Sequence, residues 1–284
     1  MRWENQRRSG NVEDRRGMRV PGGIAGGGIG TIVVVLIVSF LTGANPMTLL
    51  QMAGGSGQQA PAQQGQVGAP TGDPQAEFAA VVLASTEDVW SRLFQQAGAR
   101  YQPPTLVLFE GAVQSACGTN SSAVGPFYCP ADQKLYIDLG FFRELDQKFG
   151  APGDFAQAYV IAHEVGHHLQ TLLGVSEQVQ AGRQRAGEAE GNRLSVLQEL
   201  QADCFAGVWG NHAREQLLQE GDVEEGMRAA AAIGDDTLQR RSQGRVSPES
   251  WTHGSSEQRV EWLRRGLSQG TIDGCDTFGQ ASRR

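Results

Sequence analysis

Two histidines and a glutamate form the pattern H-E-x-x-H, at His163, Glu164 and His167. On a helix, residues four apart lie on one face, so both imidazole rings can bind one zinc ion. Glu164 can reach a water on that zinc and act as a general base. With five histidines in 284 residues, a chance match arises in about one such chain in 200. Apolar neighbours predict a buried helix, where such polar groups are costly without a partner, so ordinary solvated histidines are the weaker alternative.

A catalytic zinc needs a third protein ligand and an open position for water. The metzincin class is excluded, because Gln170 and Leu173 stand where that class has glycine and histidine. The downstream carboxylates that could supply the ligand are Glu177, Glu188, Glu190 and Glu199. We favour Glu199, because Asp203 follows it one helical turn later among apolar residues. Asp203 could accept the second ring N–H of a ligand histidine and fix its tautomer.

This E-x-x-x-D after H-E-x-x-H resembles the gluzincin arrangement of thermolysin-like peptidases. Over nearly its whole length the chain also resembles a family of bacterial membrane-anchored proteins, the "putative neutral zinc metallopeptidase" family. The matching strings are MRW (1–3), NVEDRRG (11–17), AHEVGHH (162–168), ELQADCFAGVW (199–209) and THGSSEQRVEW (252–262). The resemblance implies that His163, His167 and Glu199 bind zinc, with Glu164 catalytic. Gln198 departs from the thermolysin pattern, which has asparagine before the ligand glutamate.

The expected reaction is hydrolysis of a peptide bond by a zinc-activated water. Glu164 takes the proton of that water and later passes it to the leaving amine. A further donor should stabilise the oxyanion, and His253 is the best candidate, because a loop side chain before a predicted helix can face a cleft. Tyr159, one turn before the motif, is the rival and could equally be a core residue. We expect His168 and His212 to serve packing or to lie at the surface.

The first 19 residues carry six arginines and three acids, whereas residues 20–72 carry no charge at all. Residues 22–43 are mostly apolar and long enough for one transmembrane helix. A cleaved signal peptide is the alternative, with small Thr42 and Ala44 near its end, but the acids upstream favour an uncleaved anchor. The arginines predict a cytoplasmic segment 1–21, with the rest of the chain outside the cytoplasmic membrane, periplasmic or extracellular.

Residues 44–73 are rich in glycine, glutamine, alanine and proline, which predicts a flexible linker. The domain should then span 74–284, starting with a helix that Asp73 caps and Pro74 opens. Strands are expected at 105–109 and 134–138, and helices at 154–173, 190–210, 223–241 and 256–267. Gly174 should end a helix, and Ser255 with Gln258 resembles a capping box.

These elements predict an α+β, mostly helical, zincin-like metallopeptidase domain with a few early strands, preceded by one transmembrane helix. The strand at 134–138 could bind an extended substrate by edge pairing, or could be an internal strand.

Four cysteines permit three pairings. Outside the cytoplasm disulfides are allowed, and we favour Cys117 with Cys129 and Cys204 with Cys275, free buried thiols being the alternative. No C-x-x-C pair occurs, so a zinc site made of cysteines is not expected.

A net charge of −7 argues against nucleic acid as a partner. The expected partners are a peptide or protein substrate, zinc, and the lipid bilayer through residues 22–43. Two other functions compete with a membrane-anchored peptidase: a non-catalytic binding or scaffold protein with a structural zinc, and a zinc hydrolase of cell-wall peptides. Catalysis is favoured over a structural site, which would be closed by a fourth protein ligand.

Overall fold

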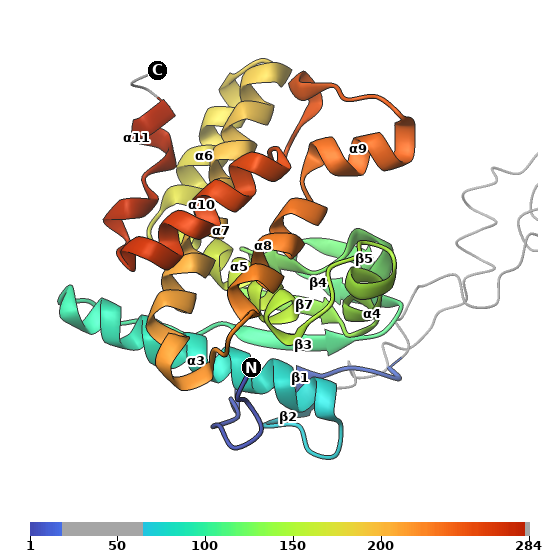
Figure 1. Ribbon diagram of the computed structural model, residues 1–284, viewed down its shortest axis with the longest axis vertical. Coiled ribbons are helices and arrows are strands. Elements are labelled where there is room, and N and C mark those ends of the chain that lie inside the picture. The colour runs from blue at the N-terminus through green and yellow to red at the C-terminus, as the bar shows by residue number, and fades with distance from the viewer. Residues whose placement is uncertain (19–64, 282–284) are drawn as a thin grey trace, which may run out of the picture. The chain divides into compact units, whose positions relative to one another are not determined.

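The computed structural model describes residues 1–18 and 65–281 (Figure 1). The expected transmembrane helix at 22–43 and residues 44–64 of the expected linker lie outside the described residues. Among the helices that the structure does describe, none combines the length and the apolar character needed to cross a bilayer. Met1–Arg16 and Gln66–Arg284 belong to one structural unit.

The strands are β1 (Val12–Asp14), β2 (Gln66–Val67), β3 (Thr105–Phe109), β4 (Ala112–Ser115), β5 (Gly118–Ser121), β6 (Phe127–Cys129) and β7 (Lys134–Asp138). The helices are α3 (Pro74–Gln96), α4 (Gly140–Gln147), α5 (Asp154–Leu172), α6 (Val175–Arg185), α7 (Glu188–Leu217), α8 (Asp222–Ala232), α9 (Asp235–Gln243), α10 (Ser256–Gln269) and α11 (Thr277–Ala281). The domain is therefore mostly helical with a few strands, as the sequence predicted.

Five strands form one sheet in the order β2-β1-β3-β7-β6. The three inner strands are parallel to one another, and β2 and β6 pair antiparallel at the two edges. The strands expected at 105–109 and 134–138 are confirmed. The suggestion that 134–138 offers a free edge is wrong, because β6 covers that side of β7.

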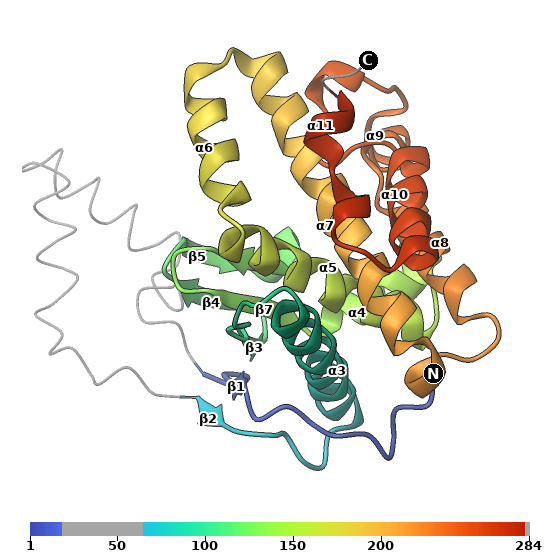
Figure 2. The ribbon, with the colours of Figure 1, turned by 90° about the vertical axis from the view of Figure 1, so that its left-hand side faces the viewer.

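Alternate side chains of the sheet enter two different cores. One face of the sheet packs into the main core together with apolar residues of α3 and α5. The residues on that face are Leu106, Leu108, Leu135 and Ile137. The opposite face joins a smaller cluster with the β4–β5 hairpin, made of Val107, Phe109, Val113, Cys129 and Tyr136. In Figures 1 and 2, α6, α9 and α11 lie above the strands, and the long helix α7 runs from the top of the view down to the level of the strands.

Local signals placed most of the predicted helices correctly. Asp73 accepts hydrogen bonds from the backbone at the start of α3, and Ser255 and Gln258 form the expected capping box of α10. The helix expected at 223–241 is wrong as a single element, because the chain turns at Gly234 between α8 and α9. A Cβ at Gly234 would lie 2.3 Å from the backbone nitrogen of Ser256, so the turn lets the start of α10 pack closely.

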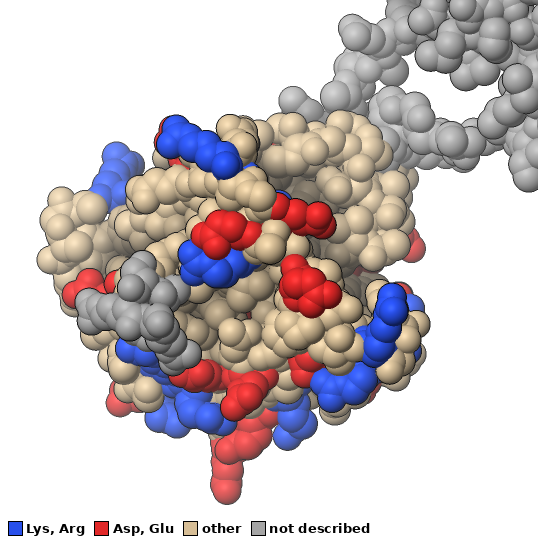
Figure 3. All heavy atoms as spheres, turned by 90° about the horizontal axis from the view of Figure 1, so that it is seen from above, with Lys and Arg blue, Asp and Glu red and all other residues tan. Residues whose placement is uncertain are grey.

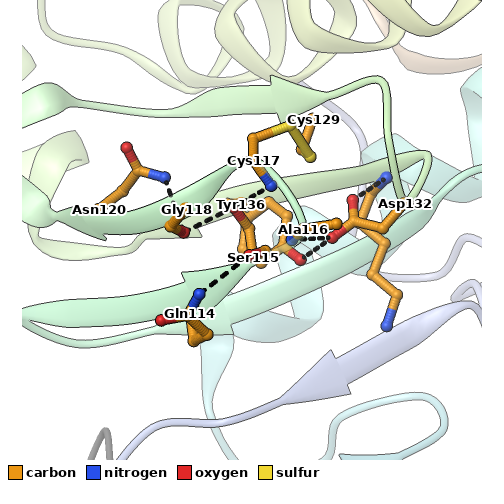
Figure 4. Close-up of a disulfide and its surroundings, with 10 residues drawn as sticks. Gln114, Ser115, Ala116, Cys117, Gly118, Asn120, Cys129, Asp132 and Tyr136 are labelled. Carbon is orange, nitrogen blue, oxygen red and sulfur yellow. Dashed lines mark hydrogen bonds between the residues drawn. A yellow bond between two sulfur atoms is a disulfide. The ribbon is translucent and has the colours of Figure 1, made fainter. Parts of the chain in front are cut away.

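Both favoured disulfides are present, Cys117 with Cys129 and Cys204 with Cys275. The second bond ties the chain after α10 to the middle of α7. The first bond joins the turn of the β4–β5 hairpin to the edge strand β6 (Figure 4).

Asp132 supports the same hairpin next to the disulfide (Figure 4). Its carboxylate accepts the backbone N–H of Ala116 at 2.9 Å and the hydroxyl of Tyr136 at 2.7 Å. The hairpin is therefore fixed to both β6 and β7 on the sheet face opposite the main core.

The N-terminal segment lies elsewhere than the sequence suggested. Residues 1–21 were expected to be apart from a domain that begins at residue 74. Instead β1 lies between β2 and β3 in the sheet, and Val12 has no solvent exposure. The physical reason is backbone pairing and burial that the composition of a short, arginine-rich segment does not reveal.

α7 and α10 meet at glycines, which lets the two backbones approach closely. A Cβ at Gly266 would lie 2.0 Å from the carbonyl oxygen of Cys204, and one at Gly207 would lie 2.3 Å from that of Leu263. α5 approaches α7 in the same way, because a Cβ at Gly166 of α5 would lie 2.9 Å from the Cα of Ala202 in α7. These contacts fix the distances between the three helices that carry the candidate site.

Replacing Gly266 with alanine should therefore push α10 away from α7. We expect Gly266→Ala to lower the free energy of unfolding by about 1–3 kcal/mol and the melting temperature by about 3–10 °C, measured by thermal denaturation. Gly191→Ala is the matched control, because Gly191 also lies within a helix and an added Cβ there would come no closer than 4.0 Å to Cγ of Arg183. Equal melting temperatures for both variants would contradict this packing.

Candidate active site

Helices α5 and α7 bring together three side chains that could hold a metal ion. His163 and His167 lie one turn apart on α5 with ring centroids 4.8 Å apart. Glu199 of α7 places one carboxylate oxygen 3.1 Å from Nε2 of His163 and the other 3.4 Å from Nε2 of His167. The three ligand atoms all lie within 4.8 Å of one another, and no other such group occurs among the described residues.

Hydrogen bonds on the far side of each ring determine which nitrogen faces this cluster. Nδ1 of His163 lies 2.8 Å from Oδ1 of Asp203, and Nδ1 of His167 lies 2.9 Å from Oε1 of Gln170. Both acceptors assign the ring proton to Nδ1. In the neutral tautomer each Nε2 therefore presents a lone pair toward the carboxylate of Glu199.

This arrangement fits a divalent cation. Lone pairs on two imidazoles and a carboxylate repel one another unless positive charge lies between them. Burial alone would lower the pKa of His163, but the charge of Asp203 and the hydrogen bonds to Asp203 and Glu199 outweigh it and raise the pKa to about 10. Two imidazole nitrogens and one carboxylate oxygen are the donor set of catalytic zinc sites.

Asp203 is the hub of a hydrogen-bond network behind His163. It has no solvent exposure and accepts two hydrogen bonds of 2.9 Å from the guanidinium of Arg259. Burial raises the pKa of Asp203, but Arg259 and His163 outweigh it and hold the pKa at about 2. Asp203 is therefore an ionised acceptor that orients the ring, as its spacing from Glu199 predicted.

Tyr159 belongs to this same network. Its hydroxyl donates to Asp203 at 2.5 Å and accepts from Arg259 at 3.1 Å. Because its proton is committed to Asp203, the hydroxyl supports the buried ion pair. This geometry argues against Tyr159 as the oxyanion donor.

Glu164 lines the same cavity as the three ligating groups. Its side chain is buried, and burial raises its pKa despite the opposing effect of His167 and His163. A carboxylate of raised pKa beside a metal site is suited to accept and return a proton near neutral pH.

His253 also lines this cavity, from the loop before α10, with about half of its side chain exposed. Asp235, the first residue of α9, lies 3.3 Å from Nδ1 of His253 and accepts the backbone N–H of the same residue at 2.6 Å. It also accepts the N–H groups of Thr252 and Gly254. The hydrogen bond that His253 donates to Asp235 raises the pKa of His253 against the effect of burial.

The cavity has a volume of about 570 Å³. Edge strand β6 lines it through Phe127 and Tyr128, and α4 and the chain after it contribute Phe141 and Phe149. The wall facing the ligating groups is therefore largely aromatic. On the face of the molecule seen in Figure 3, acidic and basic side chains gather along the lower edge, and much of the rest of the described surface is uncharged.

The other carboxylates considered from the sequence do not join the site. Glu177, Glu188 and Glu190 are exposed, and Glu190 pairs with Arg193 at 2.7 Å. His168 and His212 lie elsewhere, as expected. His168 is buried between Tyr128 and a backbone carbonyl, and His212 contacts the carbonyl of Gly270.

Three site residues were missed from the sequence: Arg259, Asp235 and Gln170. The burial of Arg259 could have been predicted, because it lies on the face of α10 that buries Trp262, Leu263 and Gly266. A charged residue on an apolar face requires a buried partner. Asp235 gave no comparable signal, because its role depends on a loop that approaches from residue 252 onward.

A family model described as "putative neutral zinc metallopeptidase" matches residues 1–278. The chain belongs to this family. The resemblance inferred from the motifs is thereby confirmed, and the match includes the N-terminal segment as well as the helical domain.

Relatives in this family carry no functional description in their names. "Uncharacterized protein YpfJ" of Escherichia coli K12 is 48% identical over 294 residues, covering 99% of this chain and 100% of that protein. "Uncharacterized protein Rv2575" of Mycobacterium tuberculosis H37Rv is 43% identical over 209 residues, covering 69% of this chain and 68% of that protein. No solved structure matches the chain significantly.

Removing the carboxylate ligand should abolish stoichiometric metal binding. We expect the wild type to retain about one zinc per chain after dialysis, and Glu199→Gln to retain little, as measured by atomic emission spectroscopy. Glu190→Gln is the matched control, because Glu190 is an exposed glutamate of the same helix. Full zinc retention by Glu199→Gln would exclude it as a ligand.

Proposed function

We propose that this protein is a zinc metallopeptidase that hydrolyses peptide bonds with Glu164 as general base. The observation that carries the proposal is the convergence of His163, His167 and Glu199 beside a buried Glu164 in one open cavity. Family membership supports zinc as the metal.

The protein's residues divide the work of the proposed reaction. A bound zinc ion would supply Lewis acidity, lowering the pKa of a bound water and polarising the substrate carbonyl. Glu164 accepts the proton of the attacking water and returns it to the leaving amine. Asp203, held by Arg259, keeps His163 in the tautomer that ligation requires.

His253 is suited to stabilise the oxyanion. Asp235 occupies its Nδ1 side, so donation toward the cavity comes from Nε2–H. A ring that gives Nδ1–H to Asp235 also carries Nε2–H only when it is protonated. The raised pKa of His253 favours that protonated form, which places a positively charged donor at the cavity wall.

The edge strand β6 offers a way to hold an extended substrate. It pairs with β7 on one side, and its residues Phe127 and Tyr128 line the cavity. An extended peptide could add to such an edge through backbone hydrogen bonds, with its side chains meeting the aromatic wall. This role, considered from the sequence for residues 134–138, belongs in our proposal to β6.

A non-catalytic scaffold with a structural zinc is less well supported. Structural zinc sites are closed by four protein ligands. Within the part of the chain that the structure describes, the cluster offers three and lies beside a titratable carboxylate. The surrounding cavity leaves room for a substrate.

We also propose that the domain acts outside the cytoplasm. Its two disulfides support an oxidising compartment, because such bonds rarely persist in the cytosol. Association with the bilayer through residues 22–43 is part of this proposal and concerns residues outside those described.

Glu164→Gln tests the catalytic role directly. The amide cannot accept a proton, so we expect kcat to fall by about 10²- to 10⁴-fold while zinc content stays at the wild-type level. Casein and isolated muropeptides should both be offered as substrates, since the same residues would serve either. Glu144→Gln is the control and should keep wild-type activity, because Glu144 is a half-exposed glutamate that lines the same cavity without joining the ligand cluster. Unchanged hydrolysis by Glu164→Gln would refute the mechanism.

Asp235→Asn should change the pH dependence of hydrolysis. Asp235 raises the pKa of His253, so its loss lowers that pKa and the donating, protonated form disappears at lower pH. We expect the alkaline limb of the kcat/KM profile to move to lower pH. Asp236→Asn removes the adjacent carboxylate, which contacts Ser256 and Arg240 instead, and should leave the limb in place. Equal profiles for both variants would argue against His253 as the donor.

A further inference from the structure

The first 16 residues make contacts that a segment on the other side of a membrane could not make. Five arginines of this segment had suggested a cytoplasmic location, yet all of them bond within the domain. Arg7 pairs with Glu87 at 3.0 Å, and Arg8 pairs with Glu77 at 2.5 Å. The remaining contacts are Arg16 with Asp73, Arg2 with the carbonyls of Glu215 and Leu218, and Arg15 with the carbonyl of Gln114.

The N-terminal amino group is itself buried. The ammonium of Met1 has no solvent exposure and lies 3.5 Å from a carboxylate oxygen of Asp222, at the start of α8. It lies 3.6 Å from Asp154, the first residue of the zinc-site helix α5. The buried Asp222 is thereby paired with a positive charge, so Met1 connects the segment to the start of α8.

Buried polar and apolar groups continue this attachment along the segment. Ser9 has no solvent exposure and donates to Glu87 at 2.5 Å. Val12 is equally buried and is paired in parallel register with Leu106 of β3. Residues of this segment therefore form part of the buried core of the domain.

The two ends of the intervening stretch lie next to each other. β1 and β2 are antiparallel neighbours, with Glu13 opposite Val67 and Asp14 opposite Gln66. The described residues on either side of the intervening stretch therefore meet at the same edge of the sheet. A single crossing of a bilayer by residues 22–43 would put β1 and β2 on opposite faces.

We propose that Met1–Arg16 is retained in the mature protein and lies in the same compartment as the zinc domain. The apolar stretch then does not cross the bilayer once as a single-pass anchor. This replaces the expectation of a cytoplasmic segment 1–21 opposite an external domain. The arginines serve as partners for acids of the domain instead of marking the cytoplasmic side.

Cysteine labelling in membrane vesicles tests this placement with the full-length chain. Gly10→Cys reports on the N-terminal segment and Gln96→Cys on the domain, since both positions are exposed. The four native cysteines are disulfide-bonded, so the wild type gives the background. Each variant is treated with a membrane-impermeant maleimide in right-side-out and in inside-out vesicles.

We expect both variants to be labelled in the same vesicle preparation and protected in the other. Labelling of Gly10→Cys and Gln96→Cys in opposite preparations would overturn the proposal. The mass of the purified chain should show that residues 1–16 are retained. A chain that begins near Ala44 would equally overturn it.

A stability measurement gives an independent readout. Val12→Asp buries a charge in the sheet and should lower the melting temperature of the full-length protein by about 5–10 °C. Asn5→Asp adds the same charge at an exposed position and should leave it unchanged. An unaltered melting temperature for Val12→Asp would show that the segment is not part of the folded domain. Neither experiment depends on peptidase activity.

Discussion

Asp203 is a carboxylate without solvent exposure, held by Arg259 through two hydrogen bonds. A buried charge without its partner costs about 3–5 kcal/mol, so the two residues must be placed together. The same carboxylate accepts the proton on Nδ1 of His163 and the hydroxyl of Tyr159. One ion pair therefore links α5, α7 and α10 and decides which nitrogen of His163 faces Glu199.

The surrounding fold keeps this ion pair in place by bringing three helices unusually close. Glycines at the α7–α10 and α5–α7 contacts leave no room for a Cβ. The disulfide between Cys204 and Cys275 begins at the residue after Asp203 and anchors the chain that follows α10. The glycine contacts and the disulfide thus hold the hydrogen-bond network of Asp203 in place, although its members come from distant parts of the sequence.

Local signals in the sequence predicted the parts of the site that lie on single helices. His163, Glu164 and His167 share one turn of α5, and Asp203 follows Glu199 by one turn of α7, so helical periodicity was sufficient. Arg259 and Asp235 reach the site from segments more than 30 residues further along the chain than Asp203 and Glu199. Their roles depend on how α9 and α10 pack, which no short pattern specifies.

The N-terminal segment illustrates the same limit. Six arginines near an apolar run gave a strong compositional signal for orientation in a membrane. Their partners, such as Glu77, Glu87 and Asp73, lie after the uncharged stretch, and the sequence does not show that they pair. Similarly, the break at Gly234 depends on the approach of Ser256, which is distant in sequence.

X-ray absorption spectroscopy of the zinc-loaded protein tests the central claim most directly, because it reports the atoms around the metal. Two imidazole nitrogens at about 2.0–2.1 Å should appear, together with oxygen from Glu199 and from solvent at about 2.0–2.2 Å. Sulfur at about 2.3 Å, or a shell closed by further imidazoles, would contradict an open site made by His163, His167 and Glu199.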